Sequence, residues 1–302
     1  MFTTSTTLII PTRNRPEFLE SSLERFLNNS IKFFEIIVVD SSDKKIKNLV
    51  KHICIKFSAN YFHTFPSTSY QRNFGMIKKN KDTKYTMFLD DDVIFYKNSI
   101  REMDKLISKY SNQDQVAAFG FNQMQFENIN FLEKLKKSKL AKIFSLYAKK
   151  PGTVTSSGWH TKILNLKEDI FSDWVFTTAC IYKSKHIQSF SFDESLGTYA
   201  YLEDLDFSLN LKLISKKIII SSKAKFIHPI NIDRSSFSFG VIEVYNRYKI
   251  VKKHNLSINY FFLGSVVRFL ISFFGVLKLN KKLLVRSFGN ILGFIKCLKD
   301  YY

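Results

Sequence analysis

The sequence predicts an α/β fold built on a mostly parallel sheet. Short apolar runs alternate with segments of helical periodicity through the first hundred residues, which is the pattern of consecutive strand–helix units. The second apolar run, Phe33 to Val39, is almost continuously apolar, as a parallel strand buried on both faces should be. With 302 residues and 45% hydrophobic composition, the chain can also bury a substantial core.

Each element follows from a local signal. Residues 8–10 are predicted as the first strand, ended by Pro11, and Asn14 is expected to cap a helix whose apolar residues recur at helical spacing up to Leu27. The later elements are predicted in order as a short helix at 46–50, a strand at 53–57, a helix at 70–76, a strand at 85–89, a helix at 97–110, strands at 116–121 and 177–182, a helix opening at 201, a strand at 218–220 and an extended piece at 224–229.

Three consecutive carboxylates, Asp90 to Asp92, follow the strand at 85–89. Adjacent anions repel each other, and such a cluster persists where a cation neutralises it. Alternation along an extended chain places Asp90 and Asp92 on one side, so both can reach one ion. The alternative is a solvated turn after a buried strand.

Ligands of parallel α/β sheets bind at the carboxyl ends of the strands. Three predicted strand ends offer polar groups there, namely Thr12, Asp40 and the carboxylates at 90–92. We therefore expect residues far apart in the sequence to meet along one edge of the sheet.

Composition narrows the function classes. Lys and Arg exceed Asp and Glu by 46 to 26, so the net charge of +20 favours anionic partners such as nucleic acid, anionic lipid or phosphorylated substrates. The isolated cysteines Cys54, Cys180 and Cys297 argue against a zinc ribbon or a disulfide framework and fit a reducing cytoplasm. Residues 1–7 lack a basic start and an apolar signal core, so secretion is not expected.

The C-terminal residues differ from the rest. We expect one domain over 1–250 and a helical, basic and apolar tail over 251–302. Arg268 interrupts the apolar run at 258–279, and an arginine at a bilayer centre costs at least ~2.5 kcal/mol, so a clean transmembrane span is disfavoured. The segment from Lys281 to Lys299 is amphipathic, with Arg286 on its charged side, and predicts a helix lying on an anionic membrane surface or packed on the domain or a partner subunit.

One further segment, Phe126 to Lys150, interrupts the strand–helix alternation with lysines among apolar residues. Two interpretations are open: a solvated helix covering the sheet, or an insertion that contacts an acceptor or a membrane.

Taken together, the residues resemble the family 2 inverting glycosyltransferases of the GT-A fold, a Rossmann-like sheet flanked by helices. The resemblance spans residues 5–250. Six motifs in the expected order carry it: Pro11-Thr12-Arg13-Asn14-Arg15, Ile37-Val38-Val39-Asp40-Ser41-Ser42, Arg72-Asn73-Phe74-Gly75, Leu89-Asp90-Asp91-Asp92, Glu203-Asp204-Leu205-Asp206 and His228-Pro229.

The resemblance implies a role for each motif. It implies a donor nucleotide pocket formed by Thr12, Arg13, Arg15, Asp40, Arg72, Asp90 and Asp91. It implies that Asp90 and Asp92, with His228, hold Mn²⁺ or Mg²⁺, the cations that such oxygen ligands select over zinc. His228 has a structural alternative, because a lone histidine before proline is commonly structural. Asp204 matches the catalytic base, which inversion requires opposite the leaving group.

The implied reaction transfers a sugar from a nucleotide-diphosphate sugar to a glycan or polyprenyl-linked acceptor in bacterial surface polysaccharide synthesis, at the cytoplasmic face of the membrane. The motifs at 70–71 and 176–178 depart from the family pattern, which leaves the donor sugar open. Homo-oligomer formation is also left open.

Three other functions compete with the glycosyltransferase prediction. A nucleotidyltransferase would need a glycine-rich phosphate loop after the first strand, and residues 11–14 contain no glycine. A nucleic-acid-binding protein is suggested by charge alone, without a recognised motif, so no nucleic acid partner is expected. A catalytically inactive sugar-nucleotide or surface-binding protein is disfavoured because Asp92 and Asp204 are both intact.

Overall fold

The computed structural model describes residues 1–125, 139, 143, 145–229, 234–274 and 281–301. They form two compact units, each assembled from two separate stretches of the chain. Unit 1 contains Met1–Gln125 and Ile163–Ile230, and unit 2 contains Phe126–Lys162 and Asn231–Tyr302. The predicted division at residue 250 stays a prediction.

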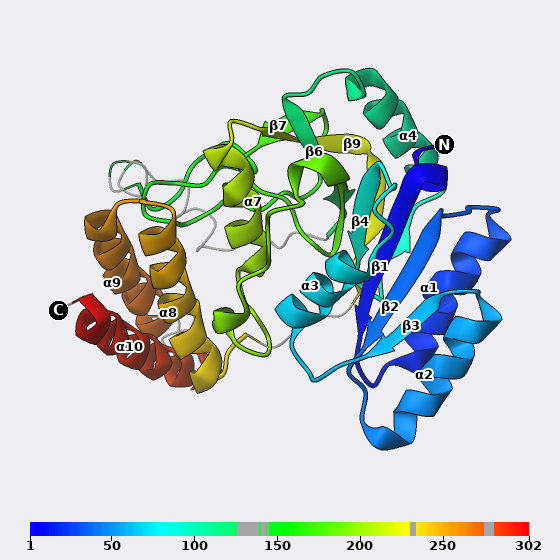
Figure 1. Cartoon of the computed structure of the whole chain (residues 1–302). Helices are drawn as coiled ribbons and strands as arrows, with labels where there is room; N and C mark the ends of the chain where they lie inside the picture. Colours follow the sequence, from blue (N-terminus) through cyan, green and yellow to red (C-terminus); the bar gives the residue numbers. More distant parts are fainter. Residues whose placement is uncertain (126–138, 140–142, 144, 230–233, 275–280, 302) are drawn as a thin grey trace. The chain divides into compact units, whose positions relative to one another are not determined.

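Unit 1 is built on one nine-stranded sheet of order β3-β2-β1-β4-β8-β6-β9-β5, with β7 paired to β9 (Figure 1). The strands are β1 (Thr6–Thr12), β2 (Glu35–Asp40), β3 (Asn60–His63), β4 (Tyr85–Leu89), β5 (Ile94–Phe95), β6 (Val116–Gln123), β7 (Ile170–Ser172), β8 (Ala179–Lys183) and β9 (Lys217–Ile227). Pairing is parallel from β3 to β4 and between β6 and β9, whereas β8, β5 and β7 run against their neighbours. The predicted α/β class with a mostly parallel sheet is confirmed.

Helices cover this sheet. They are α1 (Pro16–Asn28), α2 (Lys44–Lys56), α3 (Thr68–Lys78), α4 (Ser99–Tyr110) and α7 (Glu203–Leu213), with short 3₁₀ turns at Phe2–Ser5, Ser184–His186 and Glu194–Leu196. In Figure 1, α1 and α2 lie side by side, and α3 packs on β1 and β2. Strand β1 is buried along its whole length, which agrees with a parallel strand covered on both faces.

One predicted strand was wrong. Ile53 to Phe57 is not a strand, because Lys44–Lys56 forms a single helix and the third strand follows at Asn60–His63. Val50, Ile53 and Cys54 are buried at helical spacing. A short run of apolar residues fits either period, and here the three-to-four-residue spacing toward the core decides.

Unit 2 contains three consecutive helices, α8 (Phe237–Lys253), α9 (Ile258–Phe274) and α10 (Lys281–Tyr301). Helix α8 packs against both of the others. Among the residues that the structure describes, no helix is both long and apolar enough to cross a membrane. The segment predicted from Phe126 to Lys150 lies for the most part outside the described residues.

A buried ion cluster joins the three helices of unit 2. The Glu243 carboxylate of α8 accepts hydrogen bonds from Arg286 Nη2 of α10 at 2.6 Å and from Arg268 Nε of α9 at 3.1 Å. The sequence grouped Arg286 with Lys296 and Lys299 on the charged side of this helix, but Arg286 is buried whereas the two lysines are exposed. A guanidinium cannot lose its proton, so a buried arginine needs a carboxylate, and Glu243 supplies it.

Candidate functional site

The strand ends meet at one edge of the sheet, as predicted. Thr12 at the end of β1 is paired in register with Asp40 at the end of β2, and β1 also pairs with β4, after which the three carboxylates follow. Thr12 Oγ1 donates a hydrogen bond of 2.6 Å to Asp91 Oδ2. Arg15 Nη1 donates to Asp92 Oδ2 at 2.9 Å, and Arg15 Nη2 lies 3.2 Å from Asp91 Oδ1.

Asp91 and Asp92 are both buried, but their pKa values are shifted in opposite directions. Burial raises the pKa of Asp91 to about 7, although Arg15 and the Thr12 hydroxyl act in the opposite direction. Burial also acts to raise the pKa of Asp92, but the hydrogen bond and charge of His228, together with Arg15, outweigh it and lower that pKa. Asp92 is thus the more acidic member of the pair.

His228 follows β9 and reaches the same edge. Its Nε2 lies 3.0 Å from Asp92 Oδ1. Burial acts to lower the pKa of His228, but the hydrogen bond to Asp92 and the charges of Asp90 and Asp92 raise it. His228 therefore contacts Asp92 directly, and the metal-binding role predicted for it stays a prediction.

Arg72 connects the carboxylates with α7. Its guanidinium is 2% exposed; Nη2 donates to Asp90 Oδ1 at 2.7 Å and Nη1 donates to Glu203 Oε1. Glu203 also accepts a hydrogen bond of 3.0 Å from the Ser69 hydroxyl. Burial raises the pKa of Glu203 to about 7, with Asp204 and Asp90 adding to the effect and Arg72 opposing it. The Arg72 guanidinium therefore pairs with two carboxylates, those of Asp90 and Glu203.

A strained turn presents the acidic pair at the start of α7. Leu202, the residue before the helix, has φ 76°, in the left-handed region that side chains disfavour, and Ala200 has φ 45°. Glu203 is buried by its contacts with Arg72 and Ser69, whereas Asp204 is half-buried. The backbone N–H of Leu205 donates to Asp204 Oδ1 at 2.8 Å. Asp204 is thus the more accessible carboxylate of the pair.

Asp40 is fully buried at the end of β2. One oxygen accepts the backbone N–H of Ser42 at 2.8 Å and the other accepts the Tyr61 hydroxyl at 2.9 Å. Arg13 lies at the surface with Nη2 3.8 Å from Asp43 Oδ1. These contacts order the loop after β2.

Helix α3 is anchored by polar side chains. Gln71 Nε2 donates to the carbonyl oxygens of Thr12 and Val39, at 3.0 and 2.7 Å, and so joins the ends of β1 and β2. Asn73 exchanges two hydrogen bonds with the backbone of Phe192. The glutamine at position 71, a departure from the family pattern, therefore has a definite structural role.

Three residues of the site make contacts that were not predicted, namely Glu203, Ser69 and Tyr61. Glu203 was predicted as part of the acidic motif at 203–206, but its pairing with Arg72 was not predicted. Ser69 and Tyr61 carry no local signal, because their partners Glu203 and Asp40 lie 134 and 21 residues away in the sequence. Such pairings depend on how strands and helices are brought together.

The carboxylate cluster is not a complete metal site built from protein alone. Within the described part of the chain, no three His, Cys, Asp or Glu side chains converge as a ligand set. However, Asp92 Oδ1 and His228 Nε2 are 3.0 Å apart. Mg²⁺-type sites commonly use one or two carboxylates plus phosphate and water, and Asp92 would supply such a carboxylate with the His228 imidazole beside it. The residues therefore fit such a cation.

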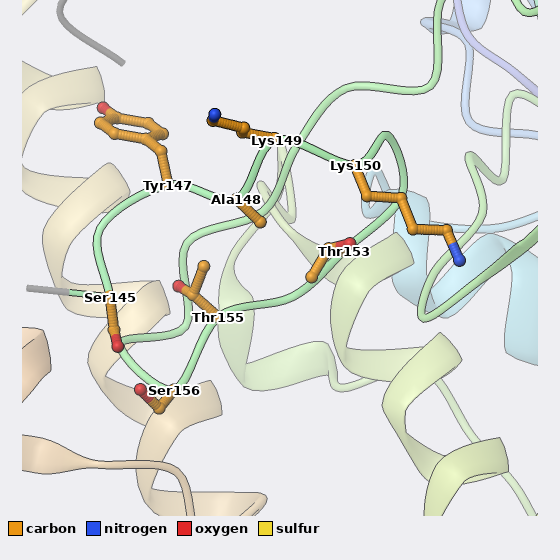
Figure 2. Close-up of a pocket in the computed structure, with 8 residues that line it drawn as sticks. All are labelled: Ser145, Tyr147, Ala148, Lys149, Lys150, Thr153, Thr155 and Ser156. Carbon is orange, nitrogen blue, oxygen red and sulfur yellow. The ribbon is translucent and has the colours of Figure 1, made fainter. Parts of the chain in front are cut away.

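A pocket of about 370 Å³ lies in unit 2 and contains none of the predicted site residues. Figure 2 shows its lining, which includes Lys149, Lys150 and the hydroxyl groups of Ser145, Thr153, Thr155 and Ser156. It has no carboxylate, so it offers neither a cation ligand of the Asp92 kind nor an acidic base. The chemistry that the sequence predicts belongs to unit 1.

Comparisons with known proteins identify the family. The family model described as "Glycosyl transferase family 2" matches residues 7–168. An uncharacterized glycosyltransferase of Rickettsia felis is 30% identical over 129 residues, which are 42% of this chain and 20% of that protein. Another from Rickettsia bellii is 35% identical over 97 residues, 31% of this chain and 14% of that protein. The matched part of the chain thus spans a fifth or less of these curated relatives.

Solved structures show the same fold. A mannosyltransferase from Pyrobaculum calidifontis, in complex with GDP-Man and Mn²⁺, has a TM-score of 0.55 at 11% identity, covering 99% of this chain and 88% of that one. GalNAc-T7, with UDP, GalNAc and Mn²⁺, has a TM-score of 0.53 at 14% identity, covering 76% and 43%. The predicted GT-A fold is confirmed.

Proposed function

Because the chain belongs to glycosyl transferase family 2, we propose that it transfers a sugar, with inversion, from a nucleotide-diphosphate sugar to a hydroxyl group. The observation that carries the proposal is the ion-paired chain from Asp90 through Arg72 to Glu203. It connects the carboxylate-rich strand end, where a nucleotide diphosphate would bind, with the acidic pair of α7, where a base is needed.

The cation of the proposal is Mn²⁺ or Mg²⁺, held by Asp92 and His228 with Asp90 nearby. Asp92 is ionised at neutral pH, and its Oδ1 faces His228 Nε2. When bound, the cation would neutralise the charge that develops on the leaving nucleotide diphosphate. The Mn²⁺ in the two solved structures named above accords with this choice.

The residues around the cation have positioning roles in this proposal. Thr12 and Arg15 hold the side chains of Asp91 and Asp92. Asp40 and Arg13, through the ordered loop after β2, would form the wall for the nucleotide base. The Nη atoms of Arg72 are engaged by Asp90 and Glu203 here, so we assign Arg72 to holding these acids beside the donor phosphates.

Asp204 is the proposed catalytic base. Inversion requires a single carboxylate that takes the proton of the acceptor hydroxyl as its oxygen attacks the anomeric carbon. Glu203 is buried and held by Arg72 and Ser69, whereas Asp204 is the more accessible acid of the pair. Fixing Glu203 also fixes the first turn of α7 and, with it, the position of Asp204.

The acceptor of the proposal is a glycan or polyprenyl-linked sugar in bacterial surface polysaccharide synthesis, presented at the inner face of the cytoplasmic membrane. The support is the basic C-terminal region. From Lys252 onward the sequence has nine Lys or Arg residues and a single acidic residue, Asp300. Each basic residue near an acidic leaflet adds ~1 kcal/mol of attraction.

The test measures hydrolysis of a panel of nucleotide sugars with and without Mn²⁺, followed by transfer to a lipid-linked acceptor. Calorimetry then compares nucleotide-diphosphate binding by the wild-type protein, Asp92→Asn and Asp82→Asn, an exposed carboxylate outside the site. We expect Asp92→Asn to lose Mn²⁺-dependent binding and Asp82→Asn to retain it. Unchanged affinity of Asp92→Asn in Mn²⁺ would contradict the cation assignment.

A further inference from the structure

Helix α10 turns its smallest residues toward α8. A side-chain Cβ at Gly289 would lie 2.1 Å from the carbonyl oxygen of Phe237, and one at Gly293 would lie 2.9 Å from that of Val241. On α8, a Cβ at Gly240 would lie 2.3 Å from the carbonyl oxygen of Arg286. The two helix backbones therefore approach each other more closely than larger side chains would permit.

The same side of α10 carries its buried polar groups. Asn290 Nδ2 donates to the carbonyl oxygen of Gly240 at 3.0 Å, and Arg286 is paired with Glu243. Small residues in a Gly-xxx-Gly spacing and polar bonds between helices are the means by which helices associate in lipid, where apolar surface gives no preference for the helix–helix contact. A helix packed in water normally buries its apolar stripe instead.

The opposite side of α10 is apolar and exposed. Five side chains, each between 38% and 54% exposed, recur there at spacings of three or four residues: Val285, Phe288, Ile291, Leu292 and Ile295. We call these five residues the α10 stripe. Helix α9 of the same unit also exposes Val266 and Leu270, one turn apart. A continuous apolar stripe of this kind on a helix marks an interaction surface.

We propose that the α10 stripe docks into the headgroup region of an anionic lipid bilayer, with α10 lying in the plane of the interface. This inference deepens the proposed function, on which it rests for its purpose, because it names the surface that would bring the enzyme to a lipid-linked acceptor. No described helix meets the requirements for crossing a bilayer, so a position in the interface accounts for the stripe better than a span.

The positive charge around the α10 stripe favours an anionic membrane as its partner. Lys296 and Lys299 are exposed next to the stripe and at its end, and Lys252 and Lys253 are exposed at the end of α8. A second copy of the chain would bring an equally positive surface to this one, and like charges across an interface are unfavourable. Anionic headgroups complement them, while the lysine stems can extend along the apolar surface.

The experiment measures partition of the full chain onto phosphatidylcholine vesicles with and without phosphatidylglycerol, by co-sedimentation at two salt concentrations. The stripe variant is Phe288→Gln with Leu292→Gln. The matched control is Ile55→Gln with Ile77→Gln, two apolar residues exposed on α2 and α3 of unit 1. We expect anionic-vesicle binding of the stripe variant to fall at least about tenfold while the control binds as wild type.

A second variant, Phe288→Trp, reports insertion directly through a blue shift of its fluorescence on anionic vesicles, relative to the wild-type protein. Wild-type binding by the stripe variant, or no vesicle binding by the full chain, would overturn the proposal. So would a lipid-free dimer that the stripe variant converts to a monomer, because a second copy would then cover the stripe. Donor hydrolysis in solution is measured on all variants, so that a failure of membrane docking is distinguished from a failure of the proposed transfer reaction.

Discussion

The two units contain buried ion clusters of opposite composition. In unit 1, Arg72 lies between the carboxylates of Asp90 and Glu203; in unit 2, the carboxylate of Glu243 lies between Arg268 and Arg286. Despite its burial, Glu243 has a pKa lowered to about 2, because the arginines outweigh desolvation, whereas burial raises the pKa of Glu203 to about 7.

This contrast distinguishes a functional site, the Arg72 cluster of unit 1, from a structural ion cluster, the Glu243 cluster of unit 2. Carboxylates that outnumber their cations hold protons or await a cation, and perturbed groups of this kind are characteristic of functional sites. A carboxylate with two guanidinium partners remains charged across the physiological range and connects helices. We therefore expect substitutions in the first cluster to change chemistry, and substitutions in the second to change stability.

The largest effect should come from Asp204→Asn, on the chemical side of the comparison. Transfer is expected to fall by roughly 10²–10⁴, the usual contribution of a positioned base, while donor affinity stays within a few-fold. Steady-state kinetics and calorimetry check this, with Asp82→Asn as the control. Near-normal turnover would move the base to Glu203 or Asp206.

Glu243→Gln tests the structural side. It leaves two buried arginines that cannot release their protons, so the free energy of unfolding should fall by ~3–5 kcal/mol at pH 7. In the wild-type protein, the stability that Glu243 contributes is present above its unfolded pKa and is lost as the pH falls toward 2. Urea unfolding at several pH values measures both. A loss below 1 kcal/mol would place the cluster among weak surface pairs.

The stability loss caused by Arg72→Met should change with pH in a higher range than the contribution of Glu243, because the pKa of Glu203 is raised rather than lowered. At pH 8 the substitution leaves Glu203 buried without its guanidinium partner, so the folded protein must hold either an unpaired charge or a proton that the unfolded chain would release, and we expect a loss of ~3 kcal/mol. Toward pH 5, Glu203 can take up a proton in the folded state, so the folded protein binds more protons than the unfolded one and the loss shrinks. Unfolding curves of wild type and variant between pH 5 and pH 8 check this. A pH-independent difference would contradict the predicted contrast with Glu243.

The smallest effect concerns the close contact of α8 and α10. Gly289→Ala places a methyl group against the Phe237 carbonyl and should lower the free energy of unfolding by ~1–3 kcal/mol. Val285→Ala, on the exposed side of the same helix, is the matched control and should stay within about 0.5 kcal/mol. Equal effects of the two substitutions would indicate that the backbones do not need this approach.

What the sequence predicted well was local or periodic. The apolar run of β2 and the carboxylates after β4 were recognised because burial and strand ends leave a pattern in consecutive residues. The error at Ile53–Phe57 arose because five apolar-rich residues fit a strand or the last turns of a helix equally well. The convergence of Thr12, Asp40 and Asp90–Asp92 followed from fold class alone.

What escaped prediction depends on distant partners. Arg286 was grouped with the lysines of α10 because a helical wheel separates charged from apolar residues, and nothing near it indicates that Glu243 will be its partner. The burial of Arg72 between Asp90 and Glu203 is of the same kind. The small residues Gly289 and Gly293 did leave a signal, a four-residue spacing that marks close helix packing.

The position of β8 in the sheet has a consequence during synthesis of the chain. β8 lies between β4 and β6, yet about ninety residues separate Leu89 from Ala179. A ribosome adding ~5–20 residues per second needs roughly 5 to 20 s to make that stretch. Until then the nascent β3-β2-β1-β4 half-sheet carries an open, apolar edge, the kind of template on which other chains aggregate. The rate of translation through residues 90–178 thus sets how long this edge of β4 waits for its partner strand.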